Sequence, residues 1–143
     1  MTTVEFHILS ATGDDARMRH ACQLVDECYG RRQRCFVRVA NDAEAQRIDE
    51  LLWTFRDQAF IPHQVMDTPP SIDPNVMVLI GDGAAPAEYK SLMINLSGAV
   101  PGDVSAFTQM IEVVDAEPQR KQQARERYKQ YRELGCTLET KNL

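Results

Sequence analysis

Four residues near the carboxyl end of this 143-residue chain have the types and the spacing to bind an acidic ligand. They are Lys121, Arg125, Tyr128 and Arg132. On a helix they recur at i, i+4, i+7 and i+11 and fall within an arc of about 60°. If Ala124, Tyr131 and Leu134 face inward, this basic stripe flanks the edge of the core. Cations beside an aromatic ring on the rim of a groove suit an acidic peptide with an apolar end.

The charge of the chain is unevenly distributed. The net charge is −5, and residues 119–134 hold six basic and two acidic side chains, a balance of +4 that leaves −9 for the rest. Both glutamates of that segment lie outside the basic stripe, whereas a solvated helix face usually mixes signs. An acidic protein with one basic patch suits a specific acidic partner better than bulk nucleic acid.

Two other interpretations of the basic stripe remain open. One is a solvated helix face on which Lys129 and Arg132 complement the carboxyl-terminal helix dipole. The other is direct nucleic-acid binding by the basic helix. The charge of the remaining chain and the lack of interleaved aromatic platforms argue against nucleic acid.

A second candidate surface surrounds Trp53. A helix over residues 41–55 would gather its apolar side chains in one arc of about 120°, and Trp53 would project about 140° from Ile48. An exposed tryptophan is typical of an interface hot spot. The residues that could extend the surface are Phe60, Ile61 and Pro62. The alternative is that residues 67–74 of the same chain cover the indole.

Motifs for catalysis or for cofactor binding are missing from the sequence. Residues 10–15 follow the first predicted strand with one glycine and two acids where a phosphate would bind, and no G-x-x-x-x-G-K-[ST] motif occurs. His7, His20 and His63 have no convergent partner, so we interpret each as structural. We therefore expect no catalytic residue, metal or cofactor. An unrecognised nucleotide-binding enzyme with a site beside Gly13 is a further alternative.

The cysteines indicate buried free thiols in a reducing compartment. Cys22, Cys28, Cys35 and Cys136 form no C-x-x-C pair and match no common zinc framework. The first residues do not resemble a signal peptide, and no stretch approaches the roughly 18 apolar residues of a membrane helix. We expect a cytoplasmic protein that is not embedded in a membrane.

The elements that must position these residues alternate between strands and helices. Strands are predicted over residues 4–9, 35–40, 76–80, 91–96 and 110–114. Helices are predicted over residues 14–30, 41–55 and 118–135, with a short one over 104–107. Asp14 or Asp15 is expected to cap the first helix, Asn41 or Asp42 the second, and Pro118 to open the last. The pattern predicts one domain, residues 1–143, with a Rossmann-like three-layer α/β fold and a mostly parallel sheet.

Two segments carry a family resemblance. One is residues 124–132, with Val113-Val114-Asp115 and Pro118 before them. The other is Leu52-Trp53 with Phe60-Ile61-Pro62-His63, preceded by Ile48-Asp49-Glu50. The first resembles the C-terminal signature, and the second the central motif, of the chi subunit family of bacterial DNA polymerase III. The resemblance covers the whole chain in length and in the order of its elements.

The resemblance implies a non-catalytic accessory subunit of the clamp-loader assembly, with a Rossmann-like fold that has no working nucleotide site. Members pair with the psi subunit and bind the acidic C-terminal tail of single-stranded-DNA-binding protein, so their link to DNA is indirect. The tail-binding positions match Lys121, Arg125, Tyr128 and Arg132. The psi-facing positions match Trp53 and Phe60, with Ile61 and Pro62 adjoining. One departure is Glu117, which stands near a usually apolar position.

Overall fold

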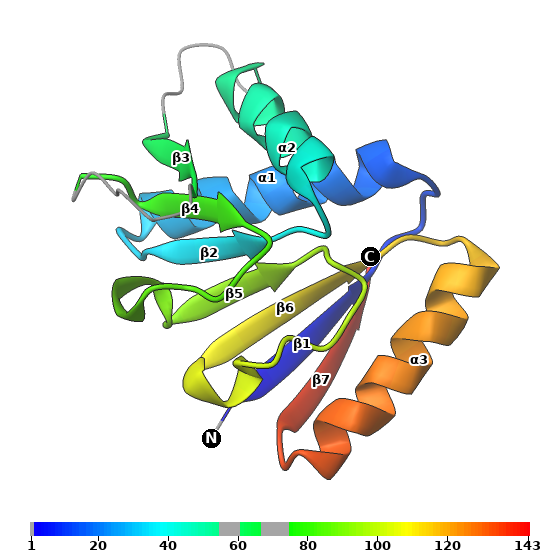
Figure 1. Ribbon diagram of the computed structural model, residues 1–143. Helices are drawn as coiled ribbons and strands as arrows, with labels where there is room; N and C mark the ends of the chain where they lie inside the picture. Colours follow the sequence, from blue (N-terminus) through cyan, green and yellow to red (C-terminus); the bar gives the residue numbers. More distant parts are fainter. Residues whose placement is uncertain (1, 55–60, 67–74) are drawn as a thin grey trace.

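A single sheet of seven strands organises the chain (Figure 1). The computed structural model describes residues 2–54, 61–66 and 75–143. The strands are β1 (Thr3–Ile8), β2 (Cys35–Arg38), β3 (His63–Val65), β4 (Val78–Gly81), β5 (Leu92–Asn95), β6 (Gln109–Val114) and β7 (Thr137–Asn142). Their order in the sheet is β3-β4-β2-β5-β6-β1-β7, and every pairing between them is parallel.

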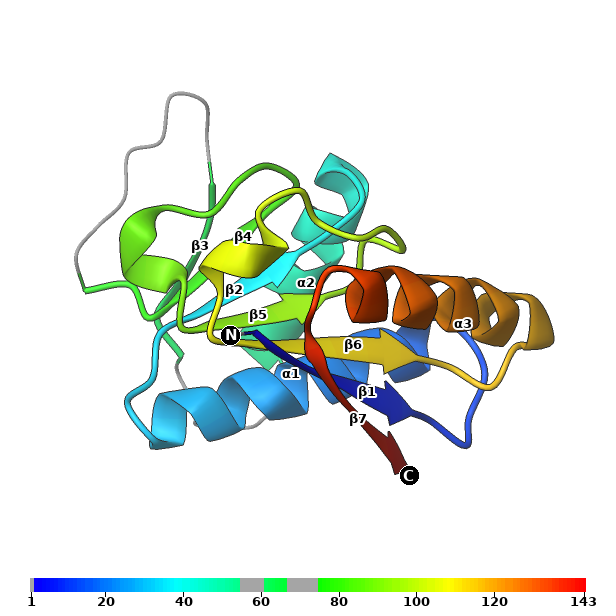
Figure 2. The same ribbon diagram turned by 90° about the horizontal axis from the view of Figure 1, so that it is seen from below.

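The helices cover both faces of this sheet. They are α1 (Asp14–Gly30), α2 (Asp42–Thr54) and α3 (Pro118–Glu133), with short 3-10 turns η1 (Ala87–Tyr89) and η2 (Val104–Ala106). Helices α1 and α2 share one apolar cluster with the sheet, and α3 contributes to a second cluster. Figure 2 shows α1 and α3 on opposite sides of the strands. The predicted three-layer α/β fold with a parallel sheet is therefore confirmed.

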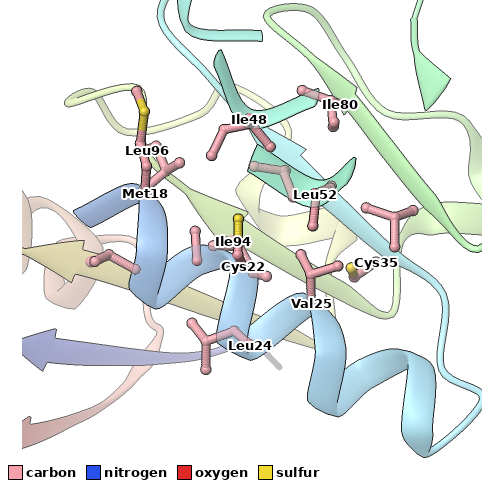
Figure 3. Close-up of a cluster of buried hydrophobic side chains, with 14 of the residues drawn as sticks. Met18, Cys22, Leu24, Val25, Cys35, Ile48, Leu52, Ile80, Ile94 and Leu96 are labelled. Atoms are coloured by element: carbon pink, nitrogen blue, oxygen red, sulfur yellow. The ribbon is translucent and has the colours of Figure 1, made fainter. Parts of the chain in front are cut away.

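The core beneath α1 and α2 follows from helical spacing. Met18, Cys22 and Val25 of α1 recur on one face and meet Ile48 and Leu52 of α2 over the strands (Figure 3). All five side chains are nearly inaccessible to solvent. Burying each large apolar side chain is worth about 1.5–3 kcal/mol, so this layer contributes strongly to the stability of the fold.

The helix caps correct one prediction and confirm another. Helix α1 is preceded by Gly13, whose φ of 109° lies in a region that suits glycine, and no side chain caps the helix there. Asp14 and Asp15, predicted as caps, instead lie in the first turn. At α2, Asn41 is the cap: its side-chain oxygen accepts the Glu44 N–H at 3.0 Å.

The predicted strands are confirmed within one or two residues at each end, but β3 and β7 were not predicted. Strands β2, β4 and β5 are buried along their whole length, and β4 lies in the continuous apolar run that predicted a buried strand of a parallel sheet. Strand β7 has charged or polar residues on both faces and lies at one edge of the sheet. Because it is largely exposed, its sequence lacks the alternation of apolar residues by which a strand is predicted. Strand β3, at the other edge, has only three residues.

Within the described part of the chain, no helix combines the length and the apolar character that crossing a membrane requires. The segment 67–74, considered above as a cover for Trp53, lies outside the described residues.

Candidate functional site

Helix α3 is fixed to the sheet by a few buried side chains. Ala124 and Tyr131 lie in the second apolar cluster, where the Tyr131 ring meets Phe6 edge-on with 6.0 Å between ring centroids. The Tyr131 hydroxyl donates to Oε2 of Glu112 on β6. Burial raises the pKa of Tyr131 and the nearby carboxylate raises it further, so the phenol stays a donor.

Leu134 corrects the predicted inward face of this helix. Helical spacing predicts that it faces inward with Ala124 and Tyr131, but its side chain is 61% exposed. The helix ends at Glu133, and Leu134 is the C-cap residue. Gly135 follows with a φ of 86°, a conformation that turns the chain toward β7 and away from the helical repeat.

Arg127 replaces Leu134 as the third buried side chain of α3, and sequence reasoning missed it. Only 8% of Arg127 is exposed, and its Nη2 lies 3.3 Å from Oε1 of Glu112. Asn95 of β5 donates to the other oxygen of Glu112 at 2.7 Å. Burial nevertheless raises the pKa of Glu112 above its ordinary value, against the attraction of Arg127. This network ties α3 to β5 and β6.

Arg120 is also occupied by carboxylates. Its Nη1 lies 3.0 Å from Asp14 at the start of α1 and 3.0 Å from Asp115 after β6. Two of the six cations counted in residues 119–134, Arg120 and Arg127, are therefore neutralised by the chain itself.

The remaining cations of α3 surround a groove of about 460 Å³ between this helix and the β1–β7 edge of the sheet. Its lining, which we call the basic groove, consists of Phe6, Ile8, Lys121, Ala124, Arg125, Tyr128, Lys129, Arg132, Thr140 and Asn142. The structure thus brings together all four residues of the predicted basic stripe.

The floor of the basic groove is apolar. Phe6 and Ile8 alternate along β1 and so point to the same face of the sheet. The Tyr128 ring lies over Phe6, with 5.5 Å between centroids and a tilt of 49°. Period-two alternation in the first strand was the signal that could have added Phe6 and Ile8 to the site. Thr140 and Asn142 had no such signal, because β7 itself was not predicted.

In the part of the chain that the structure describes, no carboxylate pairs with the charges of the basic groove. The cations are Lys121, Arg125, Lys129 and Arg132. Within the described ranges, no carboxylate oxygen lies within 4.0 Å of any of these four side chains. Arg125 donates a 3.3 Å hydrogen bond to the Gln122 amide oxygen. Four cations around an apolar floor have the charge and the apolar surface that an anionic ligand with an apolar portion would need.

Glu117, the departure noted in the sequence, has a structural role. It is the N-cap of α3, and its side-chain Oε2 accepts the Arg120 N–H at 2.9 Å. Pro118 occupies the first helical turn, as predicted. A carboxylate at a helix amino terminus interacts favourably with the helix dipole.

Trp53 is exposed at the end of α2, as predicted. Its side chain is 57% exposed, and its ring lies 5.1 Å from the ring of His63 on β3. Pro62 is half-buried, whereas Ile61 is 2% exposed and belongs to the core beneath α1 and α2. Phe60 lies outside the described residues. Trp53 therefore lies at the edge of β3 beside His63, which Pro62 precedes in the chain, and the Ile61 side chain is not part of this surface.

His7 and His20 have partners that the sequence did not reveal. His7 Nδ1 lies 2.8 Å from His20 Nε2, and His7 Nε2 lies 2.6 Å from Glu5. Lys141 of β7 approaches the same carboxylate at 2.9 Å. Burial tends to raise the pKa of Glu5, but the contacts with Lys141 and His7 lower it overall. This chain of contacts joins α1, β1 and β7 on the face of the sheet opposite the basic groove.

A buried carboxylate lies at the crevice where many parallel α/β sheets bind nucleotides. Strands β1 and β6 are neighbours, and the helices that follow them lie on opposite faces, an arrangement that often marks a ligand site. Asp115 is inaccessible to solvent, accepts the Gly13 N–H at 2.7 Å and pairs with Arg120. The Ala116 N–H also donates to the Ala11 carbonyl at 2.9 Å. A phosphate at this turn would meet a buried negative charge.

The cysteines are free, as predicted. Cys22, Cys28 and Cys35 are buried, and Cys136 is half-buried. Burial raises the pKa of the Cys22 thiol to about 12, which leaves it unreactive near neutral pH. Among the residues that the structure describes, no group of three or more His, Cys, Asp or Glu side chains is arranged to hold a metal ion.

Comparisons with known proteins agree with the resemblance noted in the sequence. The family model described as "DNA polymerase III chi subunit, HolC" matches residues 1–139. A DNA polymerase III subunit chi of Pseudomonas aeruginosa is 33% identical over 143 residues, covering 100% of this chain and 98% of the relative. The Haemophilus influenzae protein of the same name is 30% identical, covering 99% and 97%. That of Escherichia coli is 27% identical, covering 98% and 97%. The chain therefore belongs to the DNA polymerase III chi subunit family.

Proposed function

We propose that this chain is a non-catalytic accessory subunit of the DNA polymerase III holoenzyme that binds the acidic C-terminal tail of single-stranded-DNA-binding protein in the basic groove. The observation that carries this proposal is the groove itself, in which four cations without carboxylate partners surround the apolar floor made by Phe6, Ile8 and Tyr128. The charge and the shape both suit a short peptide with acids and an apolar end.

The binding mode follows from the positions of these side chains. Acids of the tail lie along Arg125 and Arg132, and its apolar end packs against Tyr128 and Phe6. Hydrogen bonds to charged groups contribute about 1.5–3 kcal/mol each. A micromolar affinity, about −8 kcal/mol, is consistent with a few such contacts. Because these cations are exposed to solvent, added salt weakens binding.

The second part of the proposal concerns the clamp loader. The psi subunit contacts the surface around Trp53 and Pro62, because an exposed tryptophan is typical of an interface hot spot and Pro62 precedes His63, whose ring Trp53 contacts. Ile61 supports this surface from within the core. The chain then bridges the clamp loader and single-stranded-DNA-binding protein.

A peptide titration tests the tail site. Synthetic tail peptide is titrated into the full chain and into Arg125→Ala and Arg132→Ala, and each variant is expected to bind about tenfold more weakly. Arg19→Ala is the matched control, because Arg19 is an exposed arginine of α1 on the other face of the sheet. Equal affinities for the chain and both groove variants would refute the assignment.

The same titration with single-stranded oligonucleotide separates the tail site from direct nucleic-acid binding. The proposal predicts tight binding of the tail peptide and much weaker binding of the oligonucleotide. Oligonucleotide binding that exceeds peptide binding and that falls in the Arg125→Ala variant would instead make the basic groove a nucleic-acid site.

A further inference from the structure

Strand β7 forms one wall of the basic groove and also one edge of the sheet. Its Thr140 and Asn142 side chains line the groove, and Leu138 packs against the cluster beneath α3. On one side β7 pairs with β1, and no strand of the described residues pairs with its other side. An open strand edge of this kind presents unpaired backbone donors and acceptors.

The backbone N–H and C=O groups of successive β7 residues point alternately toward β1 and toward the open edge, and two hydrogen bonds show which residues face β1. The Thr137 N–H donates to the Thr2 carbonyl at 2.9 Å, and the Leu143 N–H donates to the Ile8 carbonyl at 2.8 Å. In a parallel ladder, residues whose backbone groups face the partner strand recur every second position. The odd-numbered residues of β7 therefore face β1, and the N–H and C=O groups of Leu138, Thr140 and Asn142 point toward the open edge.

Leu138, Thr140 and Asn142 thus belong both to the region beneath α3 and to the open edge of β7. Their side chains point toward α3 and the groove, while their backbone groups point outward along the rim of that groove. An extended peptide that is hydrogen-bonded to this edge places every second side chain on the side of the sheet that α3 covers. Acidic side chains at those positions are attracted to the positive charges of Lys129 and Arg132.

We propose that the acidic peptide of the basic groove binds in part as an eighth strand, hydrogen-bonded to the open edge of β7 at Leu138, Thr140 and Asn142. This inference rests on the tail-binding function proposed above and specifies how the tail is held. Strand addition supplies affinity through the main chain, and the cations of α3 select for acids among the side chains that face them.

Charge favours an acidic peptide over a second copy of this chain at this edge. Pairing two β7 edges would bring two basic grooves together, each with four cations that have no carboxylate beside them. Like charges brought together at an interface oppose association. An acidic extended segment neutralises the same charges.

Amide hydrogen exchange measured by NMR tests the proposal on the full chain, with and without a saturating synthetic tail peptide. The expected result is that the amides of Leu138, Thr140 and Asn142 exchange freely alone and at least tenfold more slowly with peptide. The amides of Glu139 and Lys141, which face β1, are the internal control and stay protected in both states.

The possible outcomes separate this inference from the function on which it rests. If peptide shifts the Tyr128 ring signals but leaves the even-numbered amides unprotected, strand addition is overturned and tail binding stands. If peptide does not bind, both proposals are overturned. Protection that grows with protein concentration in the absence of peptide would assign the edge to a second copy and overturn the inference.

Peptide analogues give an independent readout. Replacing one backbone amide of the tail at a time by an ester removes a donor and leaves the side chain. Esters at alternate positions should weaken binding about three- to tenfold, and esters at the intervening positions should leave affinity unchanged. A pattern without alternation would contradict strand addition.

Discussion

His20 illustrates how a residue with no visible partner in the sequence acquires a defined environment in the fold. It lies on α1, thirteen positions from His7, and the two rings come within 2.8 Å only because β1 and α1 lie against each other. Burial lowers the pKa of His20, and the charge of His7 lowers it further. Behind His7 lie Glu5 of β1 and Lys141 of β7, and Gln23 is the neighbour on the same helix.

This environment predicts a pH dependence of stability. Because the pKa of His20 is lower in the folded chain than its ordinary value of 6.5, the unfolded chain takes up the proton more readily. The contribution of neutral His20 to the unfolding free energy is thus fully present above about pH 6.5. It is lost as the pH falls through the pKa of His20 in the folded chain. Urea denaturation should show that the difference in unfolding free energy between the natural chain and His20→Gln shrinks between about pH 7.5 and about pH 5. Parallel pH curves would contradict this.

At the scale of one helix, α3 shows why identical residue types have different roles. Arg125 and Arg127 are two positions apart, which places them on different faces. Arg125 lines the basic groove, whereas Arg127 is buried against Glu112. The pattern of charges in the sequence does not predict which of the two arginines is buried. The position of β6 beneath the helix distinguishes them.

Substitution should separate these two arginines by stability. Arg127→Ala leaves the Glu112 carboxylate buried without its cation and should cost about 3–5 kcal/mol of unfolding free energy. Arg125→Ala, the matched control on the same helix, should change it by less than about 0.5 kcal/mol. Urea denaturation measures both.

A double variant identifies the cause of that loss. Arg127→Ala with Glu112→Gln removes both charges and has the same shortened side chain at position 127, so it should recover much of the stability lost in Arg127→Ala. If the double variant is no more stable than the single one, lost packing and not the unpaired carboxylate is responsible.

The same helix marks how far the sequence could predict the site. The stripe Lys121, Arg125, Tyr128 and Arg132 was predictable because helical spacing is a local property of the chain. The opposite wall of the groove was not, because β7 is an exposed polar edge strand whose pairing with β1 is a long-range contact. Leu134 was assigned to the core because its spacing continues the helical repeat beyond the residue at which the helix ends.

At the scale of the whole molecule, the two proposed binding surfaces lie far apart. Trp53 contacts His63 of β3, and the basic groove borders β7, so the surfaces sit at opposite edges of the seven-stranded sheet (Figure 1). Six strand spacings of about 4.8 Å separate these edges by roughly 29 Å. That distance is about three times the screening length in physiological salt, so charge at one surface has little influence at the other.

This separation predicts that the two surfaces bind independently. Trp53→Ala should weaken capture of the psi subunit about 30-fold, as expected for an interface hot spot, and should leave tail-peptide affinity unchanged within about twofold. Arg132→Ala should do the reverse. Leu134→Ala is the control for loss of an exposed apolar side chain elsewhere.

Titrating tail peptide into the chain alone and into its complex with psi measures the coupling between the two surfaces directly. Because the two surfaces share no residue and lie at opposite edges of the sheet, we expect no coupling, and a tail affinity that changes when psi is bound would contradict the independent bridge.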